Sequence, residues 1–271
     1  MPTASVTDAR LHYERAGTGT QLLHIGGTGG DLRRSPSPLE WPGAERFDQV
    51  VYDHRGLGRS IAAEPSAQPA MADFAADALA LADHLGWHHF AVLGVSFGGM
   101  VAQELAIAAG SRLTHLVLAC TSSGGAGGAS APLHEILALE PETALARMVE
   151  LVDTRTNEDV ALRTTLMETL APLTDPAQRP PGLALQLEAR RHHDAWSRLR
   201  EIVAPTLVVA GCYDGLAPPA NARALAGAIG GAELEIFDGG HDFLRQDPRA
   251  WPRVGAFLAR SARSQVDQDG F

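Results

Sequence analysis

Ser96 lies at the centre of the sequence Gly-Val-Ser-Phe-Gly, residues 94–98. A serine hydroxyl attacks a carbonyl carbon only when a base removes its proton and N–H groups stabilise the resulting oxyanion. The pattern G-x-S-x-G presents such a serine at a sharp turn, where the glycines let a preceding strand and a following helix pack closely. Chance produces this pattern in a chain with 28 glycines. The prediction that Ser96 is a nucleophile therefore depends on its context, a predicted strand over 90–93 and a predicted helix over 98–109.

Two backbone N–H groups are the candidates for the oxyanion hole. Phe97 follows the serine at the predicted helix N-terminus, where N–H groups point toward negative charge. Gly27 lies in the glycine cluster 26–30, directly after the predicted strand 21–25. A phosphate-binding loop is the alternative for this cluster, but the Walker pattern needs a lysine and the chain has none. No dinucleotide fingerprint is matched either, because the cluster does not run into a helix.

Eleven histidines compete for the role of the base. His241 follows the predicted strand 233–237, on a loop at its carboxyl end, which is where the mechanism needs it. The rival histidines lie inside a strand, before a strand or in a helical segment: His24, His88, His89, His192 and His193.

Asp214 is the candidate for the acid that orients the histidine. It lies on the loop after the predicted strand 206–210, at the same edge of the sheet. Asp238 and Asp242 are rivals, but they flank His241 in sequence and point elsewhere. The order Ser96, Asp214, His241 differs from the chymotrypsin and subtilisin orders and is typical of a strand–turn–helix nucleophile.

Short apolar runs alternate with longer helical patterns, which predicts an α/β fold with a mainly parallel sheet. A β-hairpin is predicted over 5–15. The predicted strands are 21–25, 49–53, 90–93, 113–119, 206–210 and 233–237, and the helices are 71–85, 98–109, 220–229 and 249–260.

Residues 122–201 interrupt this alternation. A Gly/Ser/Ala-rich linker is followed by four helical patterns and no strand. The sequence therefore predicts a helical cap or lid, 122–201, inserted into a core made of 1–121 and 202–271. The helices are expected at 131–139, 142–152, 157–170 and 183–199, and the polar tail 261–271 is expected to fray.

Four motifs in this order resemble the α/β-hydrolase superfamily over nearly the whole chain. They are the serine turn, Asp-His-Arg-Gly-Leu-Gly-Arg-Ser at 53–60, the strand leading to Asp214, and Gly-Gly-His at 239–241. Within the superfamily the chain is similar to the esterase, enol-lactonase and cofactor-free haloperoxidase group. These proteins often have His-Gly at the oxyanion loop, whereas here His24 lies one position earlier. Gly27 and Thr28 therefore both remain candidates for the donor, while Asp53 and Arg55 are expected to be structural.

Composition excludes several classes of function. The net charge is −10, and its 22 basic residues are all arginines without a basic stripe, so nucleic acid is not an expected partner. Cys120 and Cys212 form no Cys-x-x-Cys pair and are expected to be small buried residues, with neither as nucleophile. No signal peptide or apolar run of about 20 residues is visible, so we expect a soluble, cytoplasmic protein without membrane partner, metal or cofactor.

The resulting hypothesis is a serine hydrolase of a small carboxylic ester or lactone that forms an acyl-enzyme on Ser96. The same three residues also permit hydrolysis of a C–C bond in a diketone, or perhydrolysis with haloperoxidase activity. A non-catalytic small-molecule receptor on the same fold is the alternative from another class.

Overall fold

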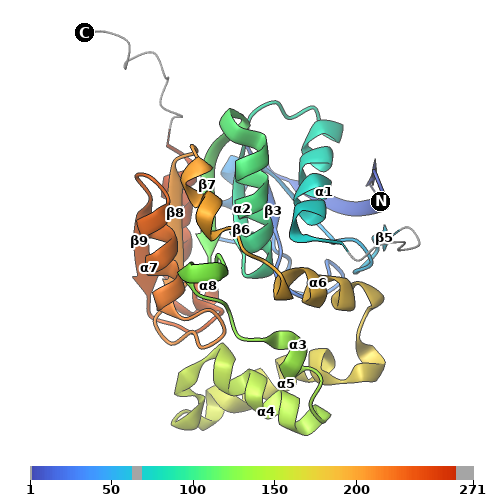
Figure 1. Cartoon of the computed structure of the whole chain (residues 1–271), viewed down its shortest axis with the longest axis vertical. Helices are drawn as coiled ribbons and strands as arrows, with labels where there is room; N and C mark the ends of the chain where they lie inside the picture. Colours follow the sequence, from blue (N-terminus) through green and yellow to red (C-terminus); the bar gives the residue numbers. More distant parts are fainter. Residues whose placement is uncertain (1, 63–68, 261–271) are drawn as a thin grey trace.

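The computed structural model describes residues 2–62 and 69–260, and the tail predicted to fray lies outside them. Strands and helices alternate along the chain, as the sequence predicts (Figure 1). The strands are β1 Thr3–Val6, β2 Ala9–Ala16, β3 Thr20–Ile25, β4 Phe47–Tyr52, β5 Ile61–Ala62, β6 Phe90–Val95, β7 Leu113–Ala119, β8 Thr206–Gly211 and β9 Glu233–Phe237. The α-helices are α1 Met71–His84, α2 Phe97–Ala109, α3 Leu133–Ile136, α4 Pro141–Val152, α5 Val160–Thr174, α6 Pro181–Arg191, α7 Pro219–Ala228, α8 Phe243–Gln246 and α9 Ala250–Leu258.

The strands form one nine-stranded sheet with the order β1-β2-β4-β3-β6-β7-β8-β9, and β5 pairs with β2. The pairs from β4 to β9 are parallel, and those made by β2 are antiparallel. β3 lies between β4, which follows it in sequence, and β6. This reversal of strand order opens a crevice at the carboxyl ends of β3 and β6, the usual place of a binding site in such sheets.

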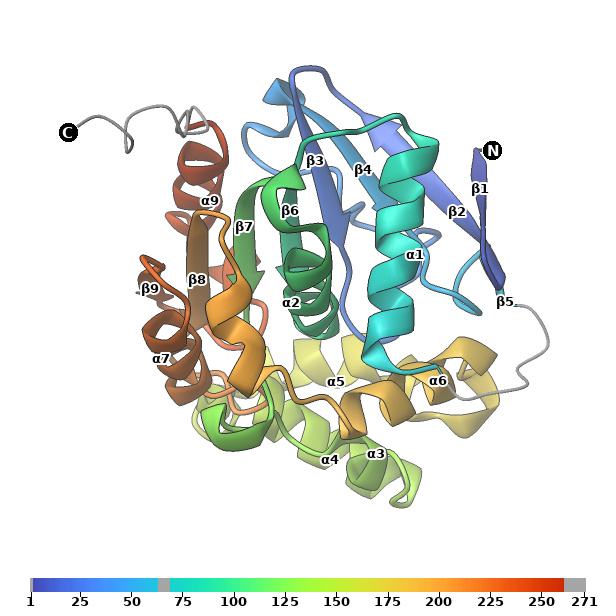
Figure 2. The same ribbon diagram turned by 45° about the horizontal axis from the view of Figure 1, so that its top comes forward.

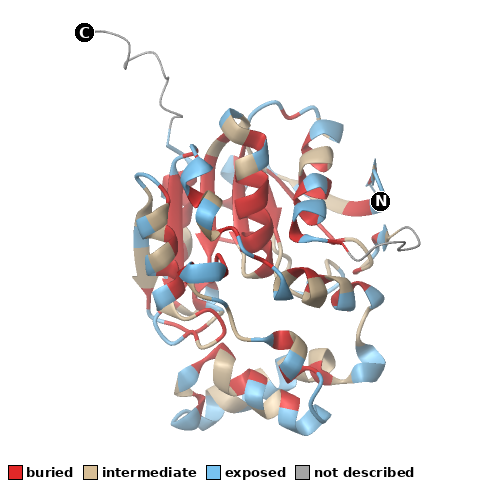
Figure 3. Cartoon of the chain, viewed as in Figure 1, coloured by how far each residue is buried: buried red, intermediate tan, exposed pale blue. Residues whose placement is uncertain are grey.

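Both faces of the central strands are buried, because their side chains alternate between two apolar layers. In β6, Val92 packs on the same side as α1 and α2, and Leu93 packs on the side of α9. α1, α2 and α7 lie together in front of the sheet, with α9 behind it (Figure 2). Buried residues fill the strands and most of α2, whereas α1 and α7 carry exposed residues on their outer sides (Figure 3). Nearly continuous apolar runs in the sequence are therefore sheet core.

Four helices, α3 to α6, lie beyond the carboxyl ends of the parallel strands (Figures 1 and 2). They have a separate apolar cluster, to which Leu216 from the loop after β8 also belongs. The cluster is made of residues from α3, α4 and α6, namely Leu133, Ile136, Met148, Val152 and Leu183, with their neighbours. No helix in the described part of the chain is both long and apolar enough to cross a bilayer.

One predicted helix is wrong in its length. The pattern over 183–199 predicts a single helix, but α6 ends at Arg191 and a 3₁₀ turn occupies Trp196–Glu201. The Asp194 carboxylate accepts a hydrogen bond from the Trp196 N–H at 3.0 Å, and the Ala195 N–H donates to the Ser123 carbonyl at 2.8 Å. An aspartate that caps a new turn competes with helix continuation, so the chain turns here.

The glycines of the serine turn are required by close packing. A Cβ on Gly98 would lie 2.0 Å from the Ile25 carbonyl oxygen of β3, and a Cβ on Gly94 would lie 2.4 Å from the Gly98 carbonyl oxygen. Since these neighbours are backbone atoms, they cannot rotate away. α2 therefore lies against β3 and β6 only because both positions lack a side chain.

We expect Gly98→Ala to lower the free energy of unfolding by more than about 3 kcal/mol, or to prevent soluble expression, because α2 must move away from β3. Gly227→Ala near the end of α7 is the matched control, since a Cβ there has no neighbour within 4 Å. It should change stability by less than about 1 kcal/mol. Urea unfolding followed by circular dichroism measures both, and a Gly98→Ala midpoint equal to that of the wild type would contradict the packing argument.

Candidate active site

Ser96 adopts a backbone conformation that non-glycine residues rarely take, with φ at 56° and ψ at −115°. Hydrogen bonds on both sides hold it there. Its N–H donates to the Ala119 carbonyl at 2.9 Å, and the Thr121 hydroxyl donates to its carbonyl at 2.7 Å. β7 and the residues after it therefore fix the turn that exposes the Ser96 side chain.

Three side chains from three strand-end loops meet in a hydrogen-bonded chain. His241 Nε2 lies 2.9 Å from Ser96 Oγ, and His241 Nδ1 lies 2.8 Å from Asp214 Oδ2. A carboxylate oxygen accepts, so Nδ1 carries the proton and the Nε2 lone pair faces the serine hydroxyl. The structure thus brings together the three residues that the sequence singles out.

Asp214 is buried, and its second oxygen has partners of its own. Asp214 Oδ1 accepts hydrogen bonds from the N–H groups of Leu216 at 2.8 Å and Ala217 at 2.9 Å. These bonds to a charged acceptor fix the carboxylate in the plane in which it meets the imidazole. The loop after β8 is therefore organised around this side chain.

The loop that carries His241 is fixed by a main-chain contact to α4 and a side-chain contact from α8. The His241 N–H donates to the Val152 carbonyl at 2.7 Å, and the Gly240 N–H donates to the Gln246 side chain at 2.7 Å. The rival carboxylates face elsewhere. Asp238 is 69% exposed in its side chain and lies 3.6 Å from Arg155, while Asp242 lies 3.5 Å from Arg245.

The glycine loop after β3 lies beside Ser96. A Cβ on Gly27 would lie 3.4 Å from Ser96 Cβ and 4.0 Å from its Oγ. Among the described residues, the N–H groups of Gly27 and Phe97 have no hydrogen-bond partner. The Thr28 hydroxyl accepts from Arg190 at 3.3 Å, and the Gly29 N–H donates to the Gln186 side chain at 2.8 Å. Two unoccupied donors therefore flank the serine hydroxyl.

His54 is a residue that the sequence reasoning missed. Its Nε2 donates to the Gly26 carbonyl at 3.1 Å, and its ring packs edge-on against Phe74 and Phe97. This hydrogen bond fixes the glycine loop at Gly26 and therefore positions the next residue, Gly27. The signal was present, because His54 follows β4 at the same edge of the sheet as the other site residues.

The remaining histidines stay apart from the serine. His24 and His193 are buried and His192 is exposed, and His88 and His89 precede β6 at the opposite edge of the sheet. The turn at 53–60 is structural, as expected. Asp53 accepts from the N–H groups of Leu32 and Arg59, and Arg55 forms a two-bond ion pair with Asp77.

The two cysteines differ, and one expectation is wrong. Cys120 is buried, but Cys212 is exposed because it lies on the loop directly after β8. Cys120 Sγ, an Asp214 oxygen and a His241 nitrogen lie within 4.8 Å of one another, which is a possible metal-ligand set. Asp214 and His241 are already joined by a hydrogen bond at 2.8 Å, and burial raises the pKa of the Cys120 thiol, which disfavours the thiolate that binds metal. This donor set suits a hydrogen-bonded pair better than a metal ion.

Comparisons with known proteins agree with this architecture. The sequence profile described as the alpha/beta hydrolase fold matches residues 23–166. The chain is 31% identical over 253 residues to a candidate non-heme bromoperoxidase of Mycobacterium tuberculosis, covering 89% of this chain and 94% of that protein. It is 27% identical over 210 residues to 3-oxoadipate enol-lactonase 2 of Acinetobacter baylyi, covering 76% of each. A hydrolase structure from Pseudomonas aeruginosa has a TM-score of 0.75 and 28% identity, covering 93% of this chain and 95% of that one.

This chain belongs to the α/β-hydrolase fold family. The predicted fold and the prediction of an α/β-hydrolase enzyme are confirmed by these matches, which cover residues 23–166 for the family profile and most of the chain for the bromoperoxidase relative and the solved structure.

The burial of His54 makes stability depend on pH. Burial lowers the pKa of His54 from 6.5 to about 4. Below about pH 6.5 the unfolded chain takes up a proton on this side chain, whereas the folded protein does so only near pH 4. The free energy of unfolding therefore falls as the pH is lowered through this window.

Between pH 6.5 and pH 5 the free energy of unfolding should fall by about 2 kcal/mol more in the wild type than in His54→Gln. The glutamine keeps an N–H donor but cannot be protonated. His88→Gln is the matched control, because it makes the same substitution at an exposed histidine. Urea midpoints at several pH values measure this. Identical slopes for His54→Gln and the wild type would show that His54 is not buried in its neutral form.

Proposed function

We propose that the protein is a serine hydrolase that cleaves a carboxylic ester or lactone through an acyl-enzyme on Ser96. The observation that carries this proposal is the unbroken chain of hydrogen bonds from Asp214 through His241 to Ser96 Oγ, at 2.8 and 2.9 Å. Such a chain makes an otherwise weak hydroxyl nucleophilic.

In the first half-reaction, His241 Nε2 takes the hydroxyl proton as Ser96 Oγ bonds to the substrate carbonyl carbon. Asp214 keeps the imidazole in the required tautomer and stabilises the imidazolium that forms. The negative charge that develops on the carbonyl oxygen is met by the N–H groups of Phe97 and Gly27. His241 then donates its proton to the leaving alcohol oxygen, and the acyl-enzyme remains.

In the second half-reaction, a water molecule gives a proton to His241 and its oxygen attacks the acyl carbon. The bond to Ser96 Oγ breaks, the proton returns to the serine and the carboxylic acid leaves. In a lactone the alcohol stays tethered to the acyl group, and the product is a hydroxy acid. No redox partner is needed for either substrate.

Gly27 is favoured over Thr28 as the second oxyanion donor. The hydrogen that Gly27 carries in place of a side chain faces Ser96, so a carbonyl can approach its N–H closely. The Thr28 N–H is likewise without a partner among the described residues, so this preference rests on the close approach of Gly27 to Ser96. We assign the oxyanion hole to Phe97 and Gly27 on this basis.

We further propose that residues 122–201 act as the cap of this site, inserted into a core of 1–121 and 202–271. The support is the separate apolar cluster of these helices and their position over the carboxyl ends of the strands (Figure 2). α4 and α6 both contact catalytic loops, through the Val152 carbonyl and the Gln186 side chain. Substrate size and shape would then be selected by the inner surface of the cap.

The relative described as a candidate non-heme bromoperoxidase supports a second reaction of the same acyl-enzyme. Hydrogen peroxide would replace water and release a peracid, RCO₃H. The peracid would oxidise bromide, with RCO₃H and Br⁻ giving RCO₂⁻ and HOBr. This route keeps the roles of Ser96, His241 and Asp214 unchanged.

We expect Ser96→Ala to lower ester hydrolysis by about 10⁴- to 10⁶-fold and Asp214→Asn by about 10³- to 10⁴-fold. A fluorophosphonate probe should attach to Ser96 alone, as mapped by mass spectrometry of peptides. Ser111→Ala is the control, because Ser111 is exposed near the start of β7, at the far edge of the sheet.

A screen of small esters and lactones beside β-diketones, with and without peroxide and bromide, separates the possible reactions. Ester cleavage that persists in Ser96→Ala, or probe attachment elsewhere, would overturn the proposed nucleophile. Cleavage of diketones alone would indicate C–C hydrolysis. A ligand recovered intact, without an acylation burst, would indicate a receptor.

A further inference from the structure

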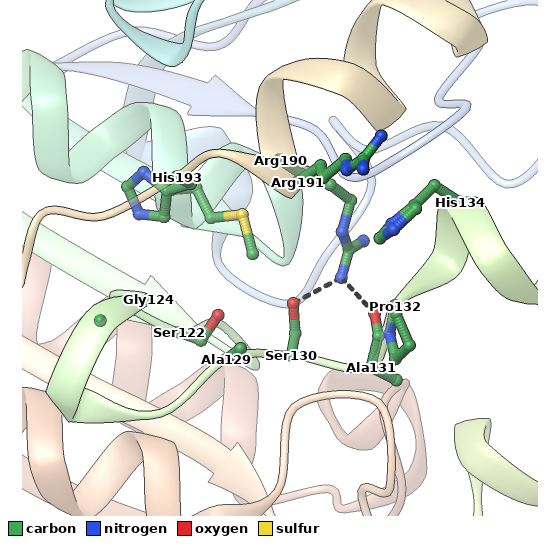
Figure 4. Close-up of a pocket in the computed structure, with 12 residues that line it drawn as sticks. Ser122, Gly124, Ala129, Ser130, Ala131, Pro132, His134, Arg190, Arg191 and His193 are labelled. Carbon is green, nitrogen blue, oxygen red and sulfur yellow. Dashed lines mark hydrogen bonds between the residues drawn. The ribbon is translucent and has the colours of Figure 1, made fainter.

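A pocket of about 220 Å³ lies between α6 and the beginning of α2 (Figure 4). Its lining includes Met100 from α2, Ser122 from the segment after β7, and residues 129–132. The Met100 N–H donates to the Ser96 carbonyl at 3.3 Å, so the pocket begins one helical turn from the nucleophile. Pockets that bind drug-sized ligands have volumes of about 300–1,000 Å³, so this smaller pocket suits a small chemical group.

The charge of this lining contrasts with the rest of the chain. The protein has 32 acidic residues and a net charge of −10. The pocket lining contains two arginines and two histidines, but no aspartate or glutamate: Arg190, Arg191, His134 and His193. Of these, Arg191 lies 4.0 Å from the Glu188 carboxylate, and His193 Nδ1 lies 3.9 Å from the Glu104 carboxylate.

Arg190 is a cation with only neutral partners among the described residues. Its Nη1 donates to the Thr28 hydroxyl at 3.3 Å, and its Nη2 donates to the Ser130 hydroxyl and, at 3.3 Å, to the Ala131 carbonyl. Figure 4 shows the Arg190 side chain extending from α6 across the pocket toward Ser130 and Ala131. Neither Nε nor the second hydrogen on Nη1 has an acceptor in the described residues.

Burial makes this arrangement costly for the protein alone. Desolvation lowers the pKa of Arg190 to about 10, so the side chain still carries its charge at neutral pH. Arg190 is half-buried and takes part in no ion pair among the described residues, so its charge has only neutral protein partners. The missing negative charge is most simply supplied by a ligand.

Other polar atoms around Arg190 also lack partners. Ser122 Oγ and both ring nitrogens of His193 are buried without a hydrogen bond in the described residues, and both side chains line the pocket. Gln186 lies one turn before Arg190 on α6, and its Nε2 is buried and unpaired in the same way. Buried polar groups are nearly always paired in proteins, so several unpaired groups in one place indicate a site that is completed by ligand.

We propose that Arg190 binds a carboxylate on the substrate, so that the hydrolase acts on an ester or lactone that also carries an acid group. The free N–H groups on Nε and Nη1 lie in the guanidinium plane but point in different directions, so each can donate one charge-assisted hydrogen bond to a carboxylate oxygen. Because Arg190 also contacts Thr28, next to Gly27, the anion site and the oxyanion loop share one support. The proposal rests on the proposed ester hydrolysis, and its test separates the two.

Two ester pairs test the subsite, with the acid on either side of the scissile bond. Monoethyl glutarate is compared with ethyl 4-carbamoylbutanoate, and 3-acetoxypropanoate with 3-acetoxypropanamide, because each amide has the shape of its acid without the charge. We expect the wild type to prefer the acid of at least one pair by about 10- to 100-fold in kcat/KM. Arg190→Met should remove this preference, so that kcat/KM on the acid falls at least about tenfold more than kcat/KM on the amide.

Arg190→Lys should recover part of the preference, because it keeps the charge but loses the planar pair of donors. Arg147→Met on α4 is the control, since Arg147 is 56% exposed in its side chain and lies outside the pocket lining. If Arg190→Met lowers hydrolysis of acid and amide equally, or if the wild type prefers no acid, Arg190 only braces α6 and the proposal is wrong.

Binding to a Ser96→Ala protein gives a measurement that needs no turnover. Isothermal titration should show glutarate binding at least about tenfold more weakly when Arg190→Met is added, and binding of glutaramide unchanged. If no ester is cleaved but this difference is found, the proposed hydrolysis fails and the anion site stands. Equal binding of glutarate to both proteins would overturn the anion site, whatever the hydrolysis assays show.

Discussion

The contact between the start of α2 and the end of β3 is the constraint on which the site depends. Gly98 brings the helix to the Ile25 carbonyl more closely than any side chain allows, and Ser96 is thereby forced to a φ of 56°. This conformation points the hydroxyl out of the sheet and leaves the Phe97 N–H free at the helix end. Hydrogen bonds to Ala119 and Thr121 hold this conformation, so β7 and the residues after it help to position Ser96.

Parallel pairing then assembles the other groups at one edge of the sheet. Ile25 lies beside Gly94, and Val95 lies beside Ala119, so the loops after β3, β6 and β7 begin at the same level. β8 and β9 extend the edge toward Asp214 and His241. A serine, a carboxylate and an imidazole that are far apart in sequence can therefore meet with hydrogen-bond precision, because each needs only a short loop.

The sheet, the order of its strands along the chain and the positions of Ser96, Asp214 and His241 could be predicted because they follow from local patterns. Each residue follows an apolar strand and lies near a glycine. His54 and Arg190 were missed for different reasons. His54 acts through one bond to a backbone carbonyl, which no pattern records. Arg190 lies on a helix whose inner face depends on how α6 is placed against the glycine loop. The turn at Asp194 was missed because a local cap outweighed helical periodicity.

The hydrogen bonds that join α4 to the loops of Asp214 and His241 are made by main-chain atoms. The N–H groups of Gly215 and His241 donate to the Leu151 and Val152 carbonyls of α4. Just after α4, the Thr154 N–H and hydroxyl both donate to the Tyr213 carbonyl. Such main-chain bonds keep their donors and acceptors when a side chain is exchanged, unless proline removes an N–H. Side chains on the inner surface of these helices can thus be exchanged while the imidazole and the carboxylate keep their places. These helices tolerate substitutions because backbone atoms make the bonds to the neighbouring loops. Under the proposed function, substrate choice could therefore change in evolution without loss of the catalytic groups.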